Sequence, residues 1–326
     1  MLNLVNLSRT RRASLSRFPA RVLQRQICIL MSSKRRAFIL DFDGTITTED
    51  TISTILEFAV SVQASKGEPA AAIRDRILSE YNEDYSKHVN NYSPTKDKRN
   101  TLAEEIDYYR SLHGVENRSF ERVSKSKLFW GISNNEWQEF GRDAVNDGKV
   151  VIREGFGNFV KEVETSGGIW GVVSVNFSSQ FIRGVLASAG VDTSMVGILA
   201  NHPDENGILF GPETGKRWSV MATSDAKLAS MEDMVNSWTR KQGTHFSQIV
   251  YIGDSGTDIE CLTEERTNGI VMAENYNSSL MQTLTRVGVE VKHIDSYQDG
   301  QEAKVHWARD FQEIVRNSSL MSQIIS

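Results

Sequence analysis

Two carboxylates that stand two residues apart are the strongest chemical signal in this sequence. Asp41 and Asp43 belong to the pentapeptide Asp-Phe-Asp-Gly-Thr, which directly follows the apolar run 37–40. Side chains alternate along a strand, so at a strand end both carboxylates face the same way. There they repel each other unless a positive charge lies nearby. The pattern favours nucleophilic or acid–base chemistry, and its ordinary alternative is a turn aspartate followed by a helix-capping aspartate.

A second pair of carboxylates follows a second apolar run. Asp254 and Asp258 lie in the segment Gly-Asp-Ser-Gly-Thr-Asp, directly after residues 249–252, and Asp258 would also suit a helix N-cap. Carboxylate oxygens such as those of Asp41 and Asp254 suit Mg²⁺, whereas zinc prefers histidine and cysteine. The chain has only 2 cysteines, too few for a cysteine-rich zinc site or a disulfide framework. The sequence therefore predicts a magnesium site.

Two weaker signals complete the set. Ser174 ends a further apolar run and is followed by Val175, Asn176 and a helical pattern. Its hydroxyl and the backbone amides of Val175 and Asn176 could donate hydrogen bonds to a phosphate, although a serine at a strand end is usually a cap. Lys227, on a helical pattern, would supply the positive charge that four aspartates require if it lies near them, whereas a lone helical lysine is usually solvated.

These side chains need a scaffold in which several strands end at one place. Short apolar runs without alternation are typical of strands covered on both faces. We expect strands at 37–40, 169–173, 197–200, 249–252, 269–272 and 289–291, and helices at 155–165, 179–189, 225–239, 277–287 and 301–315. The alternation predicts an α/β fold with a Rossmann-like, doubly wound parallel sheet, in which ligands bind at the carboxyl ends of the strands.

Residues 48–151 show a different pattern, and we call them the helical insertion. Apolar residues recur with helical spacing at 51–60, 70–85, 101–112, 119–130 and 133–145, with loops at 66–69 and 88–98 and no convincing strand. We expect an all-helical domain inserted into a core formed by residues 34–47 and 152–326. The polar stretch 201–217, which contains several glycines, is expected to form a turn or a β-hairpin.

The first 33 residues stand apart from these expectations. Nine of the 37 basic residues and none of the 42 acidic residues fall within residues 1–36. This composition suits a mitochondrial transit peptide, and the alternatives are a disordered tail or an extension upstream of Met31 in a cytoplasmic protein. The remainder carries 28 basic against 42 acidic residues, which disfavours nucleic-acid binding. No apolar run approaches the ~20 residues of a membrane span, so we expect a soluble globular protein.

The four signals, in this order, resemble the four motifs of the haloacid dehalogenase superfamily of phosphohydrolases. The resemblance covers about residues 37–295. It implies that Asp41 is the nucleophile, which takes the phosphoryl group as an aspartyl-phosphate. It also implies that Asp43 protonates the leaving oxygen and then activates water. Ser174 and Lys227 would hold the phosphoryl oxygens, and Lys227 would also neutralise the nucleophile.

The same resemblance implies a ligand set for Mg²⁺. Asp41, the backbone carbonyl of Asp43 and Asp254 would bind the ion, while Asp258 would support the site from behind. The dehalogenase branch of the superfamily lacks the second aspartate, because halide needs no proton. The presence of Asp43 therefore favours phosphoester hydrolysis.

The helical insertion corresponds to the C1 cap of this superfamily, which closes over the phosphoryl group and selects the leaving group. A closer resemblance is to the phosphatase domain of plant thiamine monophosphate phosphatase and its fungal relatives. The shared features are Asp50, the segment 156–160 that leads to the second motif, and four tyrosines of the helical insertion (Tyr81, Tyr85, Tyr108 and Tyr109). Phosphoserine phosphatases, a more distant comparison, carry Glu at the position of Asp50, so we assign Asp50 to substrate selection. The tyrosines could stack on a heteroaromatic substrate, although aromatics at helical spacing more often form core.

The expected function is that of a Mg²⁺-dependent phosphomonoesterase acting on a small phosphorylated metabolite. One alternative is a catalytically quiet protein that binds a phosphorylated ligand or a protein partner. Another is phosphotransfer to an acceptor other than water, which shares every motif. The sequence predicts no oligomeric state.

Overall fold

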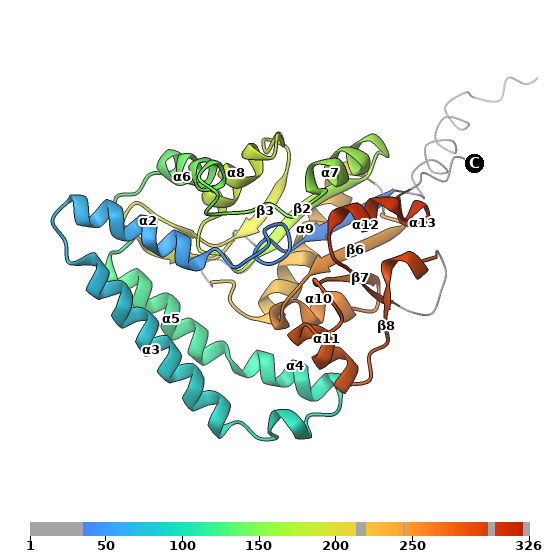
Figure 1. Cartoon of the computed structure of the whole chain (residues 1–326), viewed down its shortest axis with the longest axis horizontal. Helices are drawn as coiled ribbons and strands as arrows, with labels where there is room; N and C mark the ends of the chain where they lie inside the picture. The colour runs from blue at the N-terminus through green and yellow to red at the C-terminus, as the bar shows by residue number, and fades with distance from the viewer. Residues whose placement is uncertain (1–34, 213–219, 244, 299–303, 322–326) are drawn as a thin grey trace, which may run out of the picture.

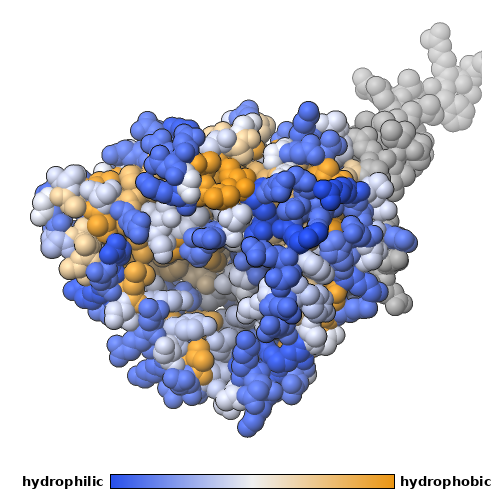
Figure 2. Space-filling view, in the orientation of Figure 1, coloured by the Kyte–Doolittle hydropathy of each residue, from blue (hydrophilic) through white to orange (hydrophobic). Residues whose placement is uncertain are grey.

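The computed structural model describes residues 35–212, 220–243, 245–298 and 304–321 (Figure 1). The basic segment 1–33, whose composition suits a transit peptide or a disordered tail, lies outside these residues. Within the described residues, none of the helices has the length and apolar character needed to cross a membrane. Hydrophilic residues cover most of the face seen in Figure 2, with smaller hydrophobic patches between them.

Seven parallel strands form the central sheet. They are β1 (Arg36–Leu40), β2 (Ile169–Ser174), β3 (Gly197–Ala200), β6 (Gln248–Gly253), β7 (Thr267–Met272), β8 (Val291–His293) and β9 (Val305–Ala308). Their order is β3-β2-β1-β6-β7-β9-β8, so β1 lies between β2 and β6. A separate antiparallel pair, β4 (His202–Pro203) and β5 (Leu209–Phe210), forms the hairpin expected within 201–217. The predicted α/β class with a doubly wound parallel sheet is confirmed.

Helices cover both faces of the sheet because its strands are apolar on both sides. Phe38 and Leu40 of β1 join one hydrophobic core, and Ala37 and Ile39 join the other. The first core includes side chains of α7 (Phe156–Thr165), α8 (Ser179–Ser188) and α12 (Phe311–Arg316). The second includes side chains of α9 (Ser224–Gln242), α10 (Ile259–Thr263) and α11 (Ser279–Arg286). Strand β1 is therefore covered on each face by one of the two hydrophobic cores.

The helical insertion contains five α-helices and one 3₁₀ turn. They are α2 (Ile52–Ser65), α3 (Ala70–Asn91), η1 (Lys96–Lys98), α4 (Leu102–Ser111), α5 (His113–Ser126) and α6 (Asn134–Asn146). A bridge between Thr47 and Ile152 brings the two ends of the insertion together. Helix α6 packs closely on α8, since a Cβ atom on Gly184 would overlap the backbone of Gln138. Helices α3, α4 and α5 lie together in the lower part of Figure 1. The domain boundaries given above stay a prediction.

Several predicted elements differ from the structure. The helix expected at 301–315 is wrong at residues 305–308, because these residues form β9 between β7 and β8, where all but Trp307 are buried. The last predicted strand is shifted to 291–293, since the amide of Val289 is bonded to Leu284 in the turn that follows α11. Helix α3 continues to Asn91 into the expected loop, and α5 begins at His113, six residues early.

Four further short elements were not predicted from the sequence. They are α10, η2 (Gly256–Asp258), η3 (Ile294–Ser296) and α13 (Ser318–Met321). Each is only three to five residues long. Such lengths are too short for a helical period to be visible in a sequence.

Candidate active site

Three neighbouring strands deliver the predicted site residues to one edge of the sheet. Asp41 follows β1, Ser174 is the last residue of β2, and Asp254 follows β6. The amide of Asp41 donates to the carbonyl of Ile252 at 2.8 Å, which extends the pairing of β1 with β6 up to the carboxylates. The structure therefore brings together the ends of three strands that lie far apart in the chain, at Leu40, Ser174 and Gly253.

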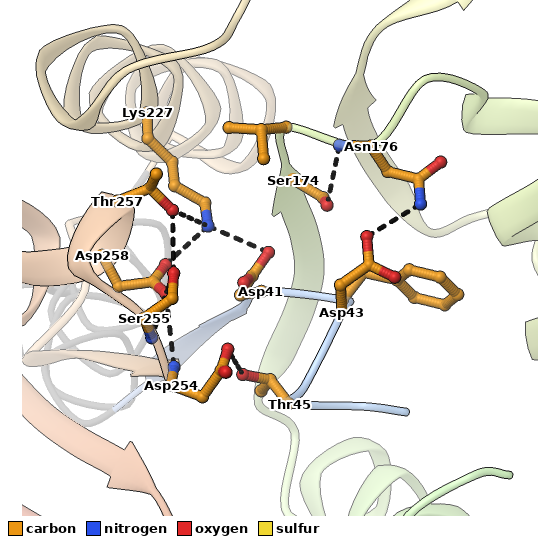
Figure 3. A network of polar contacts seen from close by, with 12 residues as sticks. Asp41, Asp43, Thr45, Ser174, Asn176, Lys227, Asp254, Ser255, Thr257 and Asp258 are labelled. Carbon is orange, nitrogen blue, oxygen red and sulfur yellow. Dashed lines mark hydrogen bonds and ion pairs between the residues drawn. The ribbon is translucent and has the colours of Figure 1, made fainter. Parts of the chain in front are cut away.

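Lys227 enters this group from the first turn of α9, and its side chain is fully buried. Its Nζ lies 2.9 Å from Oδ1 of Asp41 and 2.6 Å from Oδ1 of Asp258 (Figure 3). Burial by itself lowers the pKa of Lys227, but the two carboxylates outweigh burial and raise it above its ordinary value. Lys227 is thus a permanent buried cation between two acids, and not the solvated lysine of the alternative interpretation.

Asp41 depends on this cation. Burial raises the pKa of its carboxyl group well above the ordinary value, the charge of Asp258 raises it further, and Lys227 opposes both. Oδ1 of Asp41 is buried and faces Lys227 as an ion pair, yet within the described residues it accepts no directed hydrogen bond. A carboxylate held in this way has charge and lone pairs available for a further cation.

Asp254 lies beside Asp41 and over the loop that follows it. Its Oδ1 accepts a hydrogen bond of 3.1 Å from the hydroxyl of Thr45. Burial, followed by the charge of Asp258, raises the pKa of Asp254 to about 7. Gly44 makes this approach possible, because it has a positive φ of 68° and a Cβ atom there would overlap the Asp254 carboxylate.

Asp258 is saturated with hydrogen bonds from the protein. Its Oδ1 accepts from Lys227 and from the hydroxyl of Tyr251, each at 2.6 Å. Its Oδ2 accepts from the amides of Asp254 and Ser255 and from the hydroxyl of Ser255. Such a carboxylate orients Lys227 and the loop that carries Asp254. Both of its oxygens already accept hydrogen bonds, so few lone pairs remain free to bind a metal ion. The sequence reasoning missed Tyr251, although a tyrosine within a buried strand, seven residues before Asp258, was a visible signal.

Asp43 lies on the other side of Asp41 and points toward a different set of partners (Figure 3). Its Oδ1 accepts from the amide and hydroxyl of Thr51, at 2.9 and 2.6 Å. Its Oδ2 accepts from Nδ2 of Asn176 at 2.8 Å. Burial, and then the charge of Asp50, raises the pKa of Asp43 to about 6, which these hydrogen bonds oppose. Asp43 can therefore exchange a proton near neutral pH.

The loop after β2 also positions Asp43, while its expected contacts with a phosphate stay a prediction. The amide of Asn176 donates to Oγ of Ser174 at 3.2 Å, and the Asn176 side chain binds Asp43 and Thr51. Asn176 thus orients Asp43, a contact that spacing alone does not reveal. Ser174 is fully buried at the strand end, and Val175 is half-buried beside it.

Two further residues, Asp50 and Arg153, lie at the rim of the site. Asp50 is exposed at the start of α2, where its Oδ1 accepts from the amide of Ile52 at 2.7 Å, so its charge reaches Asp43 from the solvent side. Arg153, which the sequence reasoning missed, donates to the backbone carbonyls of Gly44 and Thr45 at 2.6 and 3.0 Å. Arg153, which follows the helical insertion in the chain, therefore holds the loop of Gly44 and Thr45 in place beneath Asp254.

The donors gathered here suit a hard divalent cation. Oxygen atoms of Asp41, Asp254 and Asp258 lie within 4.8 Å of one another. Burial is the main cause of the raised pKa values of Asp41 and Asp254; the charge of Asp258 adds to it, and Lys227 only partly opposes both. All the available ligands are oxygens, which fits Mg²⁺ and disfavours zinc. Since Asp258 is saturated, Asp41 and Asp254 are the residues of this group that fit the ion.

Comparisons with known proteins identify distant relatives. No protein-family model matches the chain. Cold tolerance protein 1 of Saccharomyces cerevisiae is 26% identical over 283 residues, which are 80% of this chain and 86% of that protein. A CTO1 family protein of Schizosaccharomyces pombe is 26% identical over 233 residues, 69% of this chain and 77% of that protein.

Solved structures with a similar arrangement include two phosphatases. A substrate-bound phosphoserine phosphatase has a TM-score of 0.45 and 15% identity, covering 87% of this chain and 98% of its own. Cytosolic 5'-nucleotidase IIIB bound to cytidine has a TM-score of 0.46 and 14% identity, covering 79% and 81%. These similarities concern the fold and assign no reaction. The chain thus has a parallel sheet with its four motifs gathered at one edge, and its place in the haloacid dehalogenase superfamily, which the motifs resemble, stays a prediction.

Proposed function

We propose that this chain is a Mg²⁺-dependent phosphomonoesterase that hydrolyses a small phosphate ester through a phosphorylated Asp41. The observation that carries the proposal is the Asp41 carboxylate at a strand end, 2.9 Å from the buried ammonium of Lys227. An anionic nucleophile can attack an anionic phosphate only where positive groups offset both charges. Bound by Asp41, Asp254 and the carbonyl of Asp43, Mg²⁺ would supply the rest of this neutralisation.

In the first half of the reaction, Asp41 is the nucleophile. Its Oδ1 faces Lys227, so Oδ2 forms the new bond to phosphorus while the bond from phosphorus to the alcohol oxygen breaks. Asp43 gives its proton to the departing alcohol oxygen. Its pKa of about 6 lets it hold that proton in part of the molecules near neutral pH, and Asn176 and Thr51 hold it in place.

In the second half, water releases the phosphate. The Asp43 carboxylate takes a proton from water, the water oxygen bonds to phosphorus, and the bond between phosphorus and Asp41 breaks. The Ser174 hydroxyl accepts from the amide of Asn176, and among the described residues its own proton has no acceptor, so it can donate to a phosphoryl oxygen. Lys227 would bind a second phosphoryl oxygen and balance the charge of the restored Asp41.

The direct test is hydrolysis of p-nitrophenyl phosphate by the purified protein. We expect turnover with Mg²⁺, its loss with a chelator, and a decrease in kcat of about 1,000-fold or more for Asp41→Asn. The matched control is Asp192→Asn, an exposed aspartate whose partner is the nearby amide of Ser194, and it should retain wild-type turnover. Full turnover in folded Asp41→Asn protein would refute the proposed nucleophile.

A further inference from the structure

A fourth strand end contributes a polar residue that lies outside the four motifs. Asn201 directly follows β3, and β3 pairs with β2 so that Ala200 lies opposite Ser174. Asn201 is fully buried, and its carbonyl accepts a hydrogen bond of 2.8 Å from the amide of Ser179 at the start of α8. Its side chain therefore lies beside the loop that follows Ser174.

The side chain of Asn201 holds two carbonyl groups of the loop after β2. Its Nδ2 donates to the carbonyl oxygens of Val175 and Asn176, at 2.9 and 3.2 Å. In a trans peptide the carbonyl and the next amide point in opposite directions, so the amides of Asn176 and Phe177 are directed away from Asn201. The first of these amides donates to Oγ of Ser174 at 3.2 Å. Asn201 thus fixes the orientation of the peptide group that contacts the Ser174 hydroxyl.

The same side chain holds the segment that leads into α9. Nδ2 of Asn201 also donates to the carbonyl of Met221 at 2.8 Å, and Oδ1 accepts from the amide of Met221 at 2.7 Å. Met221 is buried and lies two residues before Thr223, whose carbonyl accepts a hydrogen bond from the amide of Lys227. A single buried side chain therefore joins the two segments that carry Ser174 and Lys227.

This set of partners requires an amide side chain. Nδ2 meets three carbonyl oxygens, which need a donor, while Oδ1 meets a backbone amide, which needs an acceptor. A carboxylate of the same shape would have no hydrogen to offer the three carbonyls and would place a charge against them. Because the side chain of Asn201 is fully buried and bonded to the protein, it does not touch a substrate.

We propose that Asn201 is a positioning residue for the phosphoryl group. By holding the loop after β2 and the start of α9 in one arrangement, it keeps the Ser174 hydroxyl and the Lys227 ammonium at the separation at which both bind the same phosphoryl group. A displacement of about 1 Å in such a pair can cost about 100-fold in rate. The inference rests on the proposed function, which places the phosphoryl group at Asp41.

Two substitutions in the full-length protein test the inference. Asn201→Asp keeps the shape of the side chain but loses the donor, and Asn201→Ala removes the side chain without adding a charge. In folded protein, we expect kcat/KM for p-nitrophenyl phosphate to fall about 100-fold in both variants. The inhibition constant of inorganic phosphate with Mg²⁺, measured well below the melting temperature of each variant, should rise about tenfold or more.

Asn317→Asp is the matched control. Nδ2 of Asn317 also donates to backbone carbonyls, those of Ile294 and Tyr297, and its Oδ1 accepts from the amide of Leu320. This cluster lies at the start of β1, where Arg36 donates to the carbonyl of Leu320, and thus at the edge of the sheet opposite the site. The control should lower the melting temperature but leave kcat/KM and phosphate inhibition within about twofold of the wild type.

Amide hydrogen exchange in the wild-type protein covers a failure of both variants to fold. Binding of inorganic phosphate should slow exchange in residues 175–178 and 221–224 together. Protection of only one of these segments, or of neither, would overturn the inference. The same holds for wild-type kcat/KM and phosphate inhibition in either folded variant, or for equal losses in Asn317→Asp. A wild-type protein that does not hydrolyse p-nitrophenyl phosphate would instead refute the proposed function, so the two failures are distinguishable.

Discussion

Replacing Lys227 by methionine removes the cation on which the site depends. Lys227 contacts Oδ1 of both Asp41 and Asp258, and these two carboxylates have oxygens within 4.8 Å of each other. At an effective dielectric constant of about 20, two unit charges at that distance repel each other by about 3 to 4 kcal/mol. One carboxylate can escape by taking up a proton, which costs about 4 kcal/mol at pH 7 for an ordinary aspartate. We therefore expect Lys227→Met to lower the free energy of unfolding by about 3 kcal/mol at pH 7.

The pH dependence of this loss has a definite sign. Without Lys227, the pKa of the Asp41 carboxyl group rises further. Above the ordinary aspartate pKa, the folded variant therefore binds more protons than its unfolded chain. A group whose pKa is raised in the folded state destabilises it increasingly as the pH rises. The deficit of Lys227→Met should therefore shrink as the pH falls from 7 to 5.

Urea unfolding without Mg²⁺, followed by circular dichroism at pH 7 and pH 5, measures both effects. Lys125→Met is the matched control, since Lys125 is an exposed lysine paired with Glu121 four residues away. That change should cost less than about 0.5 kcal/mol. A Lys227→Met protein within about 1 kcal/mol of the wild type at pH 7, or a deficit that does not change with pH, would refute this account of the buried charges.

Three further expectations concern packing and charge. Gly44→Ala should lower the free energy of unfolding by about 1–3 kcal/mol and abolish Mg²⁺-dependent turnover. Its control is Gly148→Ala, where φ is also positive but a Cβ atom would meet no neighbour. In thermal melts this control should show only the destabilisation caused by the strained backbone. Arg110→Met should cost about 1–2 kcal/mol in urea unfolding, because it leaves the buried Glu260 without its cation. Asp84→Asn should cost at most about 1 kcal/mol at pH 7. Two arginines of α5 lower the pKa of Asp84 to about 2, so this last deficit should disappear as the pH falls from about 4 toward 2.

The sheet was predictable because its strands are buried on both faces. Runs such as 37–40 and 249–252 are continuously apolar, and the structure places β1 and β6 there. Residues 305–308 form β9, but their sequence, Val-His-Trp-Ala, joins a charged stretch that has a helical spacing of its own. A short strand of this kind is specified by its neighbours β7 and β8, and that information is not local.

The contents of the site were partly predictable for a similar reason. Asp41, Ser174 and Asp254 each follow an apolar run, so the topology of a parallel sheet is enough to bring them together. The contact of Asn176 with Asp43 was not predictable, because it depends on side-chain directions across different loops. Tyr251, which lies in a buried strand seven residues before Asp258, could have been identified from the sequence.

For the same reason, the sequence does not distinguish Glu116 from the exposed charged residues of the same helix. On α5 it is one of several charged residues at helical spacing, and nothing in that pattern separates it from the exposed Glu121. The difference arises only when α3 brings Tyr81 to it and when Phe120 turns that side of the helix toward the loop after β2. The residues of the proposed phosphoryl transfer thus lie mainly at strand ends, where sequence and topology coincide. The packing of separate helices, by contrast, is not local information, and a residue such as Glu116 acquires its surroundings only through it.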